Sequence, residues 1–182
     1  MAILASDILF KLSIKTGTAG NQNAQTDVNA ALGKYISTTQ ITDATLNNLF
    51  DDVSGDENAA SDVEYRCIFV HNAHATLTWQ SVVVWLSAEV ANGAVATIAI
   101  DDLAASAIGA AVAQADVIAD ESTAPGTGVG AFSGPTTKAT GLSLGNIAAG
   151  YCRAIWVKRS AANTAALDND GVTVRCEGDT AA

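Results

Sequence analysis

The chain has few of the side chains from which most catalytic and metal sites are built. Its 182 residues include two histidines and three cysteines, and only 5% of them are aromatic. Basic residues are also scarce, with nine Lys and Arg against nineteen Asp and Glu, which gives a net charge of −10. Such a surface repels a nucleic-acid duplex or an anionic membrane at long range. We therefore expect no nucleic-acid partner, no membrane partner and no cofactor.

Long apolar runs are missing as well. No stretch approaches the roughly 20 apolar residues that a membrane-spanning helix needs. The opening letters, MAILASDILFKLS, have no basic segment and reach Asp7 after a few apolar positions, unlike a signal peptide. Hydrophobic residues make up 49% of the chain, but many of them are alanine, so we expect one domain with a modest core. These features favour a soluble protein that is made inside the cell.

The three cysteines are an odd number in a chain too long to depend on a disulfide scaffold. They are Cys67, Cys152 and Cys176. Free cysteine is among the most buried residue types. We expect all three to be reduced, to lie on strands and to be mostly buried.

The N-terminal portion, residues 1–60, predicts an arm, a loop and a short helix that pack on or between subunits. Residues 8–14, ILFKLSI, alternate in polarity and predict a strand, and residues 34–41 predict a second, short one. The polar, glycine-containing stretch between them predicts a long loop.

A helix is predicted at about 43–53. Its apolar positions recur with helical spacing, at Leu46, Leu49, Phe50 and Val53. Thr42 suits the N-cap, and Gly55 follows the expected end.

The second portion, residues 61–182, is rich in β-branched and aromatic segments. Strands are predicted at 64–72, 77–89, 95–101, 141–147, 151–159 and 171–177. The four-residue link 73–76 predicts a hairpin, and residues 82–86 do not alternate, so both their faces should be covered. Residues 103–119 favour a turn or two of helix, and 119–137 a long loop. The fold class is thus all-β, an antiparallel Ig-like or jelly-roll-like β-sandwich with an N-terminal extended arm and one short helix.

The stretch YRCIFVHNAHATLTW, residues 65–79, invites a zinc site at Cys67, His71 and His74. On a strand, Cys67 and His71 share a face but stand about 13 Å apart, too far for one tetrahedral ion. We interpret the stretch as a strand that runs into a polar turn.

Three further patterns resemble known sites. GLSLG, residues 141–145, matches a nucleophile elbow at Ser143, but no histidine follows it, and we interpret it as a strand edge. Residues 166–177 nearly match a calcium loop through Asp168, Asp170 and Glu177, yet Ala166 stands at the first ligand position, and a turn entering a strand explains the same letters. Weak calcium binding there stays open. PGTGVGAFSG predicts a flexible loop.

The acidic run from Asp43 to Glu64 holds seven carboxylates and no basic residue. A solvated face is the ordinary interpretation, with cation or partner binding as the alternative.

A resemblance to a known group of proteins indicates a function. It rests on residues 32–72, LGKYISTTQITDATLNNLFDDVSGDENAASDVEYRCIFVHN, with 141–163, GLSLGNIAAGYCRAIWVKRSAAN, and 174–180, VRCEGDT. Taken together, these resemble a group of tailed-bacteriophage virion proteins with an immunoglobulin-like sandwich, in which a glycine such as Gly150 precedes a long aromatic-bearing strand. The disulfide and packed tryptophan of antibody domains are not evident.

The resemblance implies a non-enzymatic structural protein, of the capsid decoration or cement type, on the virion head surface. Its expected partners are the major capsid protein and itself, as a homotrimer. The arm would contact capsid or neighbouring subunits through Phe10, Leu12, Lys34 and Tyr35. Two alternatives stay open: a tail or fibre component, and a carbohydrate-binding module. The latter needs exposed Trp79, Trp85 or Trp156, of which the last two lie in apolar segments and predict core positions.

Overall fold

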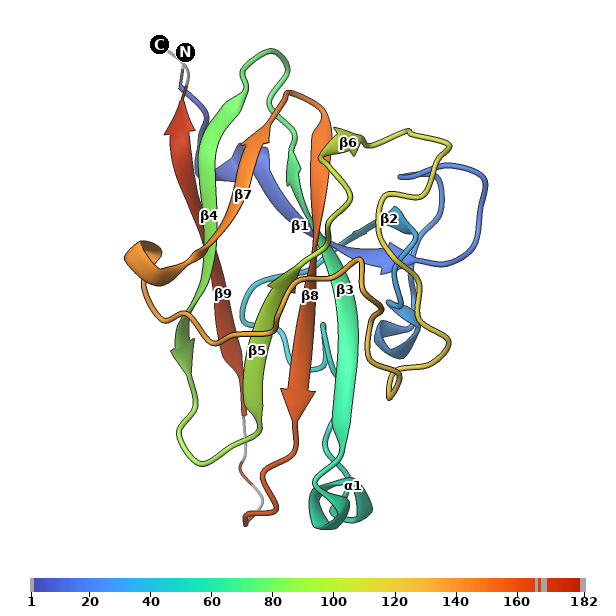
Figure 1. Cartoon of the computed structure of the whole chain (residues 1–182), viewed down its shortest axis with the longest axis vertical. Coiled ribbons are helices and arrows are strands. Elements are labelled where there is room, and N and C mark those ends of the chain that lie inside the picture. Colours follow the sequence, from blue (N-terminus) through green and yellow to red (C-terminus); the bar gives the residue numbers. More distant parts are fainter. Residues whose placement is uncertain (1, 166, 168–169, 181–182) are drawn as a thin grey trace.

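Two antiparallel β-sheets packed face to face form the protein, which confirms the all-β sandwich (Figure 1). The computed structural model describes residues 2–165, 167 and 170–180. Its strands are β1 (Ile8–Ile14), β2 (Tyr35–Gln40), β3 (Val63–Asn72), β4 (Trp79–Glu89), β5 (Val95–Ile100), β6 (Ser106–Ala107), β7 (Leu142–Ile147), β8 (Tyr151–Ser160) and β9 (Val172–Thr180). The helix α1 covers Gly55–Ala60, and short 3-10 turns lie at Ala5–Asp7, Val28–Ala30 and Lys138–Thr140. No helix in the described part of the chain is long and apolar enough to cross a membrane.

The larger sheet has the strand order β2-β1-β3-β8-β5, with the short β6 pairing to β8. The smaller sheet has the order β7-β4-β9. Every pairing is antiparallel. The main core lies between the sheets, where alternate side chains of β3 and β8 face those of β4.

A second core lies on the other face of the larger sheet. There Phe69 and Trp156 pack against Leu32, Ala115 and Ile118 from the loops. We call residues 15–34 and 101–133 the loop layer. It gives the molecule three layers, and it explains why β3 is buried on both faces from Arg66 to Asn72.

The predicted strands are confirmed to within a few residues at 8–14, 34–41, 64–72, 77–89, 95–101, 141–147, 151–159 and 171–177. The run 82–86 is largely covered, since only Val83 is partly exposed. The cysteines are free and lie on β3, β8 and β9, with Cys67 and Cys152 buried and Cys176 partly buried.

The predicted hairpin at 73–76 is wrong. Strand β3 pairs with β1 and β8, whereas β4 belongs to the other sheet. The connection therefore crosses from one sheet to the other. Buried Asn72 holds this corner because its side-chain amide donates to the carbonyls of Leu77 at 2.8 Å and Ile147 at 2.9 Å. Sandwich sheets lie about 10 Å apart, a distance that this connection spans.

The helix predicted at about 43–53 is also wrong. The helix begins later, at Gly55, where Ser54 and Glu57 form a capping box. Residues 43–53 are irregular, with Ala44 and Asn47 at positive φ, and the side chain of Leu46 is 65% exposed.

Neither the extended arm nor the short helix at 103–119 is found. Strand β1 pairs with β3 over five registered positions, so residues 8–14 lie inside the larger sheet. The predicted portions 1–60 and 61–182 therefore share one sheet. Residues 103–119 carry β6 and irregular structure, because their apolar side chains serve the second core rather than one helical stripe.

Candidate functional site

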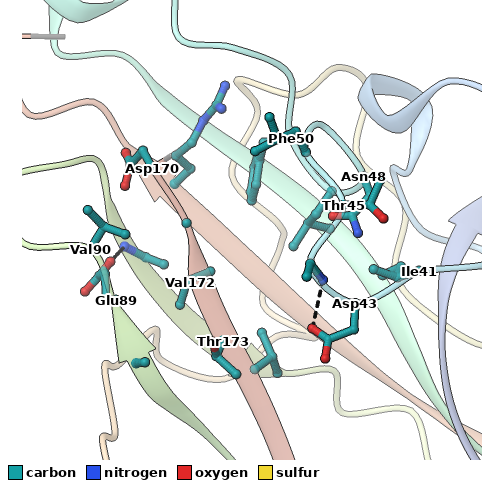
Figure 2. A pocket seen from close by; sticks show the side chains of 18 of the residues that line it. Ile41, Asp43, Thr45, Asn48, Phe50, Glu89, Val90, Asp170, Val172 and Thr173 are labelled. Carbon is teal, nitrogen blue, oxygen red and sulfur yellow. Dashed lines mark hydrogen bonds between the residues drawn. The ribbon is translucent and has the colours of Figure 1, made fainter. Parts of the chain in front are cut away.

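A cleft of about 1780 Å³ runs beside strand β9 and is the first candidate site (Figure 2). One wall is Asp170–Gly178, and the other is the irregular segment 41–54. Ile8 and Phe10 of β1 contribute to the apolar lining. We call this feature the β9 cleft.

The cleft exists because the smaller sheet stops at β9, which pairs only with β4 among the described residues. Its inward side chains Val172, Val174 and Cys176 pack on the core but stay only partly buried. Across the cleft, Ile8 and Phe10 are also partly buried. Apolar side chains of both sheets therefore remain incompletely covered here.

Phe50 anchors the cleft wall that is formed by residues 41–54. Two guanidinium groups lie close to its ring, with Arg66 at 5.0 Å and Arg159 at 4.7 Å from the ring centroid. Arg66 is fully buried and donates to Glu121 at 2.5 Å and Asn29 at 2.6 Å. Cation–π contacts gain strength when they are desolvated, so this arrangement fixes the 41–54 segment against the larger sheet.

Ion pairs add to this anchor. Arg159 pairs with Glu64 and with Asp51, the latter at 3.2 Å. Burial alone would raise the pKa of the Asp51 carboxyl, but the hydrogen bond from Asn29 and the charge of Arg159 hold it below its usual value. The acidic run is therefore not uniformly a solvated face: these two carboxylates fasten the cleft wall.

The charge around the cleft is mainly negative. The lining contains six carboxylates and two guanidinium groups, Arg159 and Arg175. The carboxylates belong to Asp43, Asp51, Asp52, Glu89, Asp170 and Glu177. Asp43 and Asp52 are exposed on the wall formed by residues 41–54. The rim therefore favours a positively charged ligand.

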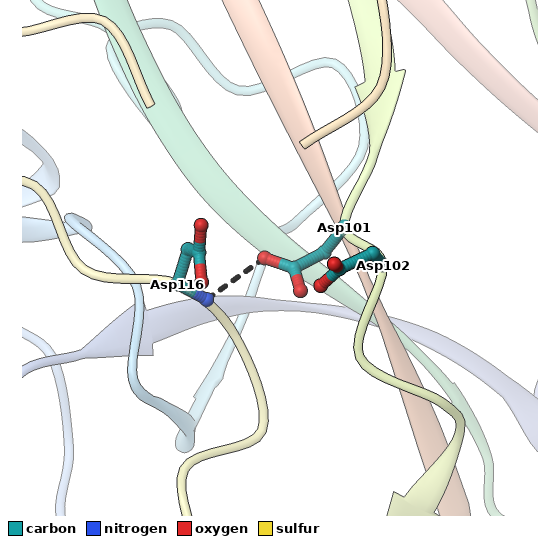
Figure 3. Close-up of side chains that lie close together, drawn as sticks. All are labelled: Asp101, Asp102 and Asp116. Atoms are coloured by element: carbon teal, nitrogen blue, oxygen red, sulfur yellow. Dashed lines mark hydrogen bonds between the residues drawn. The ribbon is translucent and has the colours of Figure 1, made fainter. Parts of the chain in front are cut away.

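A second cluster joins Asp101, Asp102 and Asp116, whose carboxylate oxygens lie within 4.8 Å of one another (Figure 3). Such oxygens suit Ca²⁺ or Mg²⁺. Fully buried Asp101 accepts from the Trp156 indole at 3.0 Å and from the backbone N–H groups of Asp116 at 2.8 Å and Leu103 at 3.1 Å. Burial raises the pKa of Asp101 despite these bonds. Asp101 thus fastens the loop layer to the larger sheet.

Neither the β9 cleft nor the aspartate cluster was predicted from the sequence. Asp101 and Asp116 are brought together by a 15-residue excursion that matches no ligand spacing. The cleft depends on how the sheets end, which strand patterns do not reveal. The adjacent acids Asp101 and Asp102 after an apolar strand were the one available signal.

The three zinc-type residues do not form a metal set. Cys67 packs in the second core, and His74 uses its Nδ1 to accept from the N–H groups of Thr76 and Leu77. The strand and polar turn are confirmed at this point. The one set within metal-holding distance in the described part of the chain is the aspartate cluster.

His71 lies apart, with its side chain buried against the loop layer. The residue is 5% exposed, and neither ring nitrogen has a hydrogen-bond partner among the residues that the structure describes. Burial, with the nearby charge of Lys11, lowers the pKa of His71 to about 4. The imidazole is therefore neutral over most of the physiological range.

Two of the other patterns have plain structures. Ser143 lies within strand β7, as expected for a strand edge. In the calcium-like pattern, Ala166 and Asp168 lie outside the described residues. Strand β9 follows where the pattern needs a helix, and Glu177 pairs with Lys138 at 2.5 Å.

The tryptophans lie in the interior. Trp156, Trp79 and Trp85 are 0%, 5% and 6% exposed, which confirms the core positions expected for Trp85 and Trp156. The guanidinium group of Arg175 also covers the Trp85 ring, at 5.8 Å. These rings do not form the open platform that a carbohydrate-binding module would need.

The predicted contact residues divide into two groups. Leu12 and Tyr35 are 3% and 5% exposed within this chain, so little of either remains for another subunit. Lys34 is partly exposed, with its ammonium group 4.9 Å from the centre of the Tyr35 ring. Phe10 is partly buried and lines the β9 cleft.

Comparisons with known proteins give no match: no family model, curated protein or solved structure is similar to this chain.

Proposed function

We propose that the chain is a non-enzymatic structural protein of a tailed-bacteriophage virion, of the capsid decoration or cement type. This role is the one that the sequence resemblance implies. The expected partner of the chain is the major capsid protein. The structural observation that carries the proposal is the β9 cleft, which leaves an apolar surface and a strand edge available to another protein.

The physical properties of the surface support a protein partner. The cleft exceeds the roughly 300–1,000 Å³ typical of small-molecule pockets, and it follows a strand instead of enclosing a compact ligand. The net charge of −10 suits a surface that faces away from packaged DNA. On a head lattice, symmetry multiplies modest contacts into high avidity.

Binding to emptied, expanded heads of the encoding phage tests the proposal. The purified chain is mixed with heads that lack it, and bound protein is counted after sedimentation. A decoration protein should bind in hundreds of copies per head and raise the temperature at which heads disrupt. No binding at all would contradict the proposal.

A tail or fibre component is the alternative role. Its copy number in intact particles would be a few to tens, and the density would lie at the tail in an electron-microscopy map. A homotrimer is part of the main proposal, and sedimentation equilibrium of the free chain measures it.

A further inference from the structure

The smaller sheet ends at an uncovered strand of nine residues, β9. At about 3.3 Å per residue, its edge offers about 30 Å of backbone. Native proteins usually shorten, bend or cover such an edge, because it can pair with another chain. Among the described residues, Ile3 reaches only its far end, where its N–H donates to the Thr180 hydroxyl at 3.3 Å.

The space beside this edge has the form that a further strand would need. The β9 cleft follows Asp170–Gly178, and in Figure 2 the 41–50 segment lies across it from Val172 and Thr173. Apolar Ile8 and Phe10 of the larger sheet line it too. A fourth strand in the smaller sheet would cover these two side chains and the partly buried inward face of β9.

The chemistry of the lining defines the strand that fits. Inward positions meet apolar groups, since Val172, Val174 and Cys176 all face the core. The lining carries six carboxylates against the guanidinium groups of Arg159 and Arg175, and Asp43 and Asp52 among them are exposed. Because strand side chains alternate between two faces, the complementary segment alternates apolar residues with Lys or Arg.

We propose that a strand of alternating apolar and basic residues, supplied by a partner protein, adds to the free edge of β9 and fills the cleft. Main-chain hydrogen bonds supply affinity and the inward pockets supply specificity, as in other strand-addition complexes. The inference rests on the proposed function, because it gives the means by which the chain grips its partner.

A labelled nine-residue peptide that alternates valine and lysine tests the site on the purified full chain. Fluorescence anisotropy should show saturable binding at 50 mM salt. A peptide alternating valine and glutamate, and one with the valines and lysines in two blocks, should bind at least about tenfold more weakly. Equal binding of the block peptide would overturn the proposal, since attraction between net charges alone would then explain it.

Two charge-matched variants locate the binding. Asp52→Lys alters the exposed cleft rim, whereas Asp120→Lys alters an exposed turn outside the cleft lining by the same charge. We expect about fivefold weaker binding for Asp52→Lys and less than twofold change for Asp120→Lys, the size of one surface charge pair. Equal losses in both variants would contradict a site at the cleft.

Amide hydrogen exchange identifies the edge itself. The Val–Lys peptide should slow exchange in Val172–Thr180 and leave β7, the other edge of the smaller sheet, unchanged. Protection of β7 alone would refute the assignment. The free chain could instead form a dimer in which β9 is protected and the peptide no longer binds. A second copy of the chain would then occupy the cleft, and the proposal of a different partner protein would be wrong.

A covalently attached strand gives an independent test. An Asn-Gly turn and a seven-residue Val–Lys strand are added after Ala182, so that the strand returns antiparallel to β9. This chain should melt at a higher temperature and lose peptide binding, unlike a matched extension with two prolines. If it still binds heads as the unmodified chain does, the cleft proposal fails while the virion role stands; if neither chain binds heads but the peptide results hold, the virion role fails alone.

Discussion

The two sheets of the sandwich end in different ways. At the outer strands of the larger sheet, β2 is covered by hydrogen bonds with Asn21 and Asn23. Strand β5 forms a bridge to Ser133, and Asp101 directly after it forms one to Val129. In the smaller sheet, β7 and β9 pair only with β4 in the part of the chain that the structure describes. Long connections therefore cover the outer strands of the larger sheet, whereas the outer strands of the smaller sheet stay uncovered in the described residues.

The two open edges differ as well. Strand β7 has six residues and contains Gly145 at a φ of +72°, which weakens it as a template for pairing. Strand β9 has nine residues and borders the apolar cleft. The difference indicates that β9 is the edge suited to a partner.

The largest expected effect separates the closed sheet from the open one. Trp156→Ala removes a fully buried ring and leaves Asp101 without its indole donor. We expect a loss of about 4 kcal/mol in the free energy of unfolding, measured by urea denaturation. Val174→Ala, on the partly covered face of β9, should cost about 1 kcal/mol. Similar costs at the two positions would break the comparison.

The buried side of the larger sheet also predicts a response to acid. Because the folded pKa of His71 is about 4 against 6.5 for the free side chain, the unfolded state binds the proton more tightly. Stability is therefore lost as the pH falls from 6.5 toward 4, by about 3 kcal/mol.

His71→Leu isolates this contribution. The substitution removes no hydrogen bond seen in the described part of the chain, where neither ring nitrogen has a partner. Denaturation at pH 7, 5.5 and 4.5 should show a flatter decline for the variant than for the original chain. Parallel curves would contradict a buried, neutral His71 beside Lys11.

Sequence patterns predicted the sheets well and their surroundings poorly. Alternation identified 8–14 as a strand, and β-branched and aromatic content identified 151–159. The spacing of Leu46, Leu49 and Phe50 predicted a helix, but the contacts of Phe50 with two distant arginines prevail over local helix propensity.

The candidate sites were hidden for a similar reason. The aspartate cluster depends on the path of the loop layer, and the β9 cleft depends on which strands lie at sheet edges. The local periodicity of a sequence predicts neither the path of a loop nor which strand lies at the edge of a sheet. Of the predicted contact residues, only Phe10 lies in the cleft, since the strand that carries it runs beneath the gap in the smaller sheet.

A smaller effect concerns the cleft wall. Phe50→Ala removes the ring that contacts Arg66 and Arg159 and should cost about 2 kcal/mol, with faster hydrogen exchange across residues 41–54. Leu46→Ala in the same segment should change stability by less than about 0.5 kcal/mol, because that side chain is mostly exposed. Equal effects would show that Phe50 is not the anchor.

The smallest expected effect concerns an exposed ion pair on the smaller sheet. The Lys138–Glu177 pair lies on the exposed outer side of the smaller sheet. The hydrogen bond between the two groups, together with their opposite charges, raises the pKa of Lys138 and lowers that of Glu177. Glu177→Gln should change the melting temperature by no more than about 2 °C, because exposed ion pairs contribute little. A larger fall would mean that the loop at 138–140 covers the smaller sheet more firmly than its exposure indicates.

Residue-resolved amide exchange of the free chain measures the open edge most directly. Protection along β9 should alternate, with slow exchange at amides bonded to β4 and fast exchange at amides that point into the cleft, while central β8 is protected throughout. Uniformly slow exchange along β9 in the monomer would show that its edge is already covered, and would contradict the account of an incomplete smaller sheet.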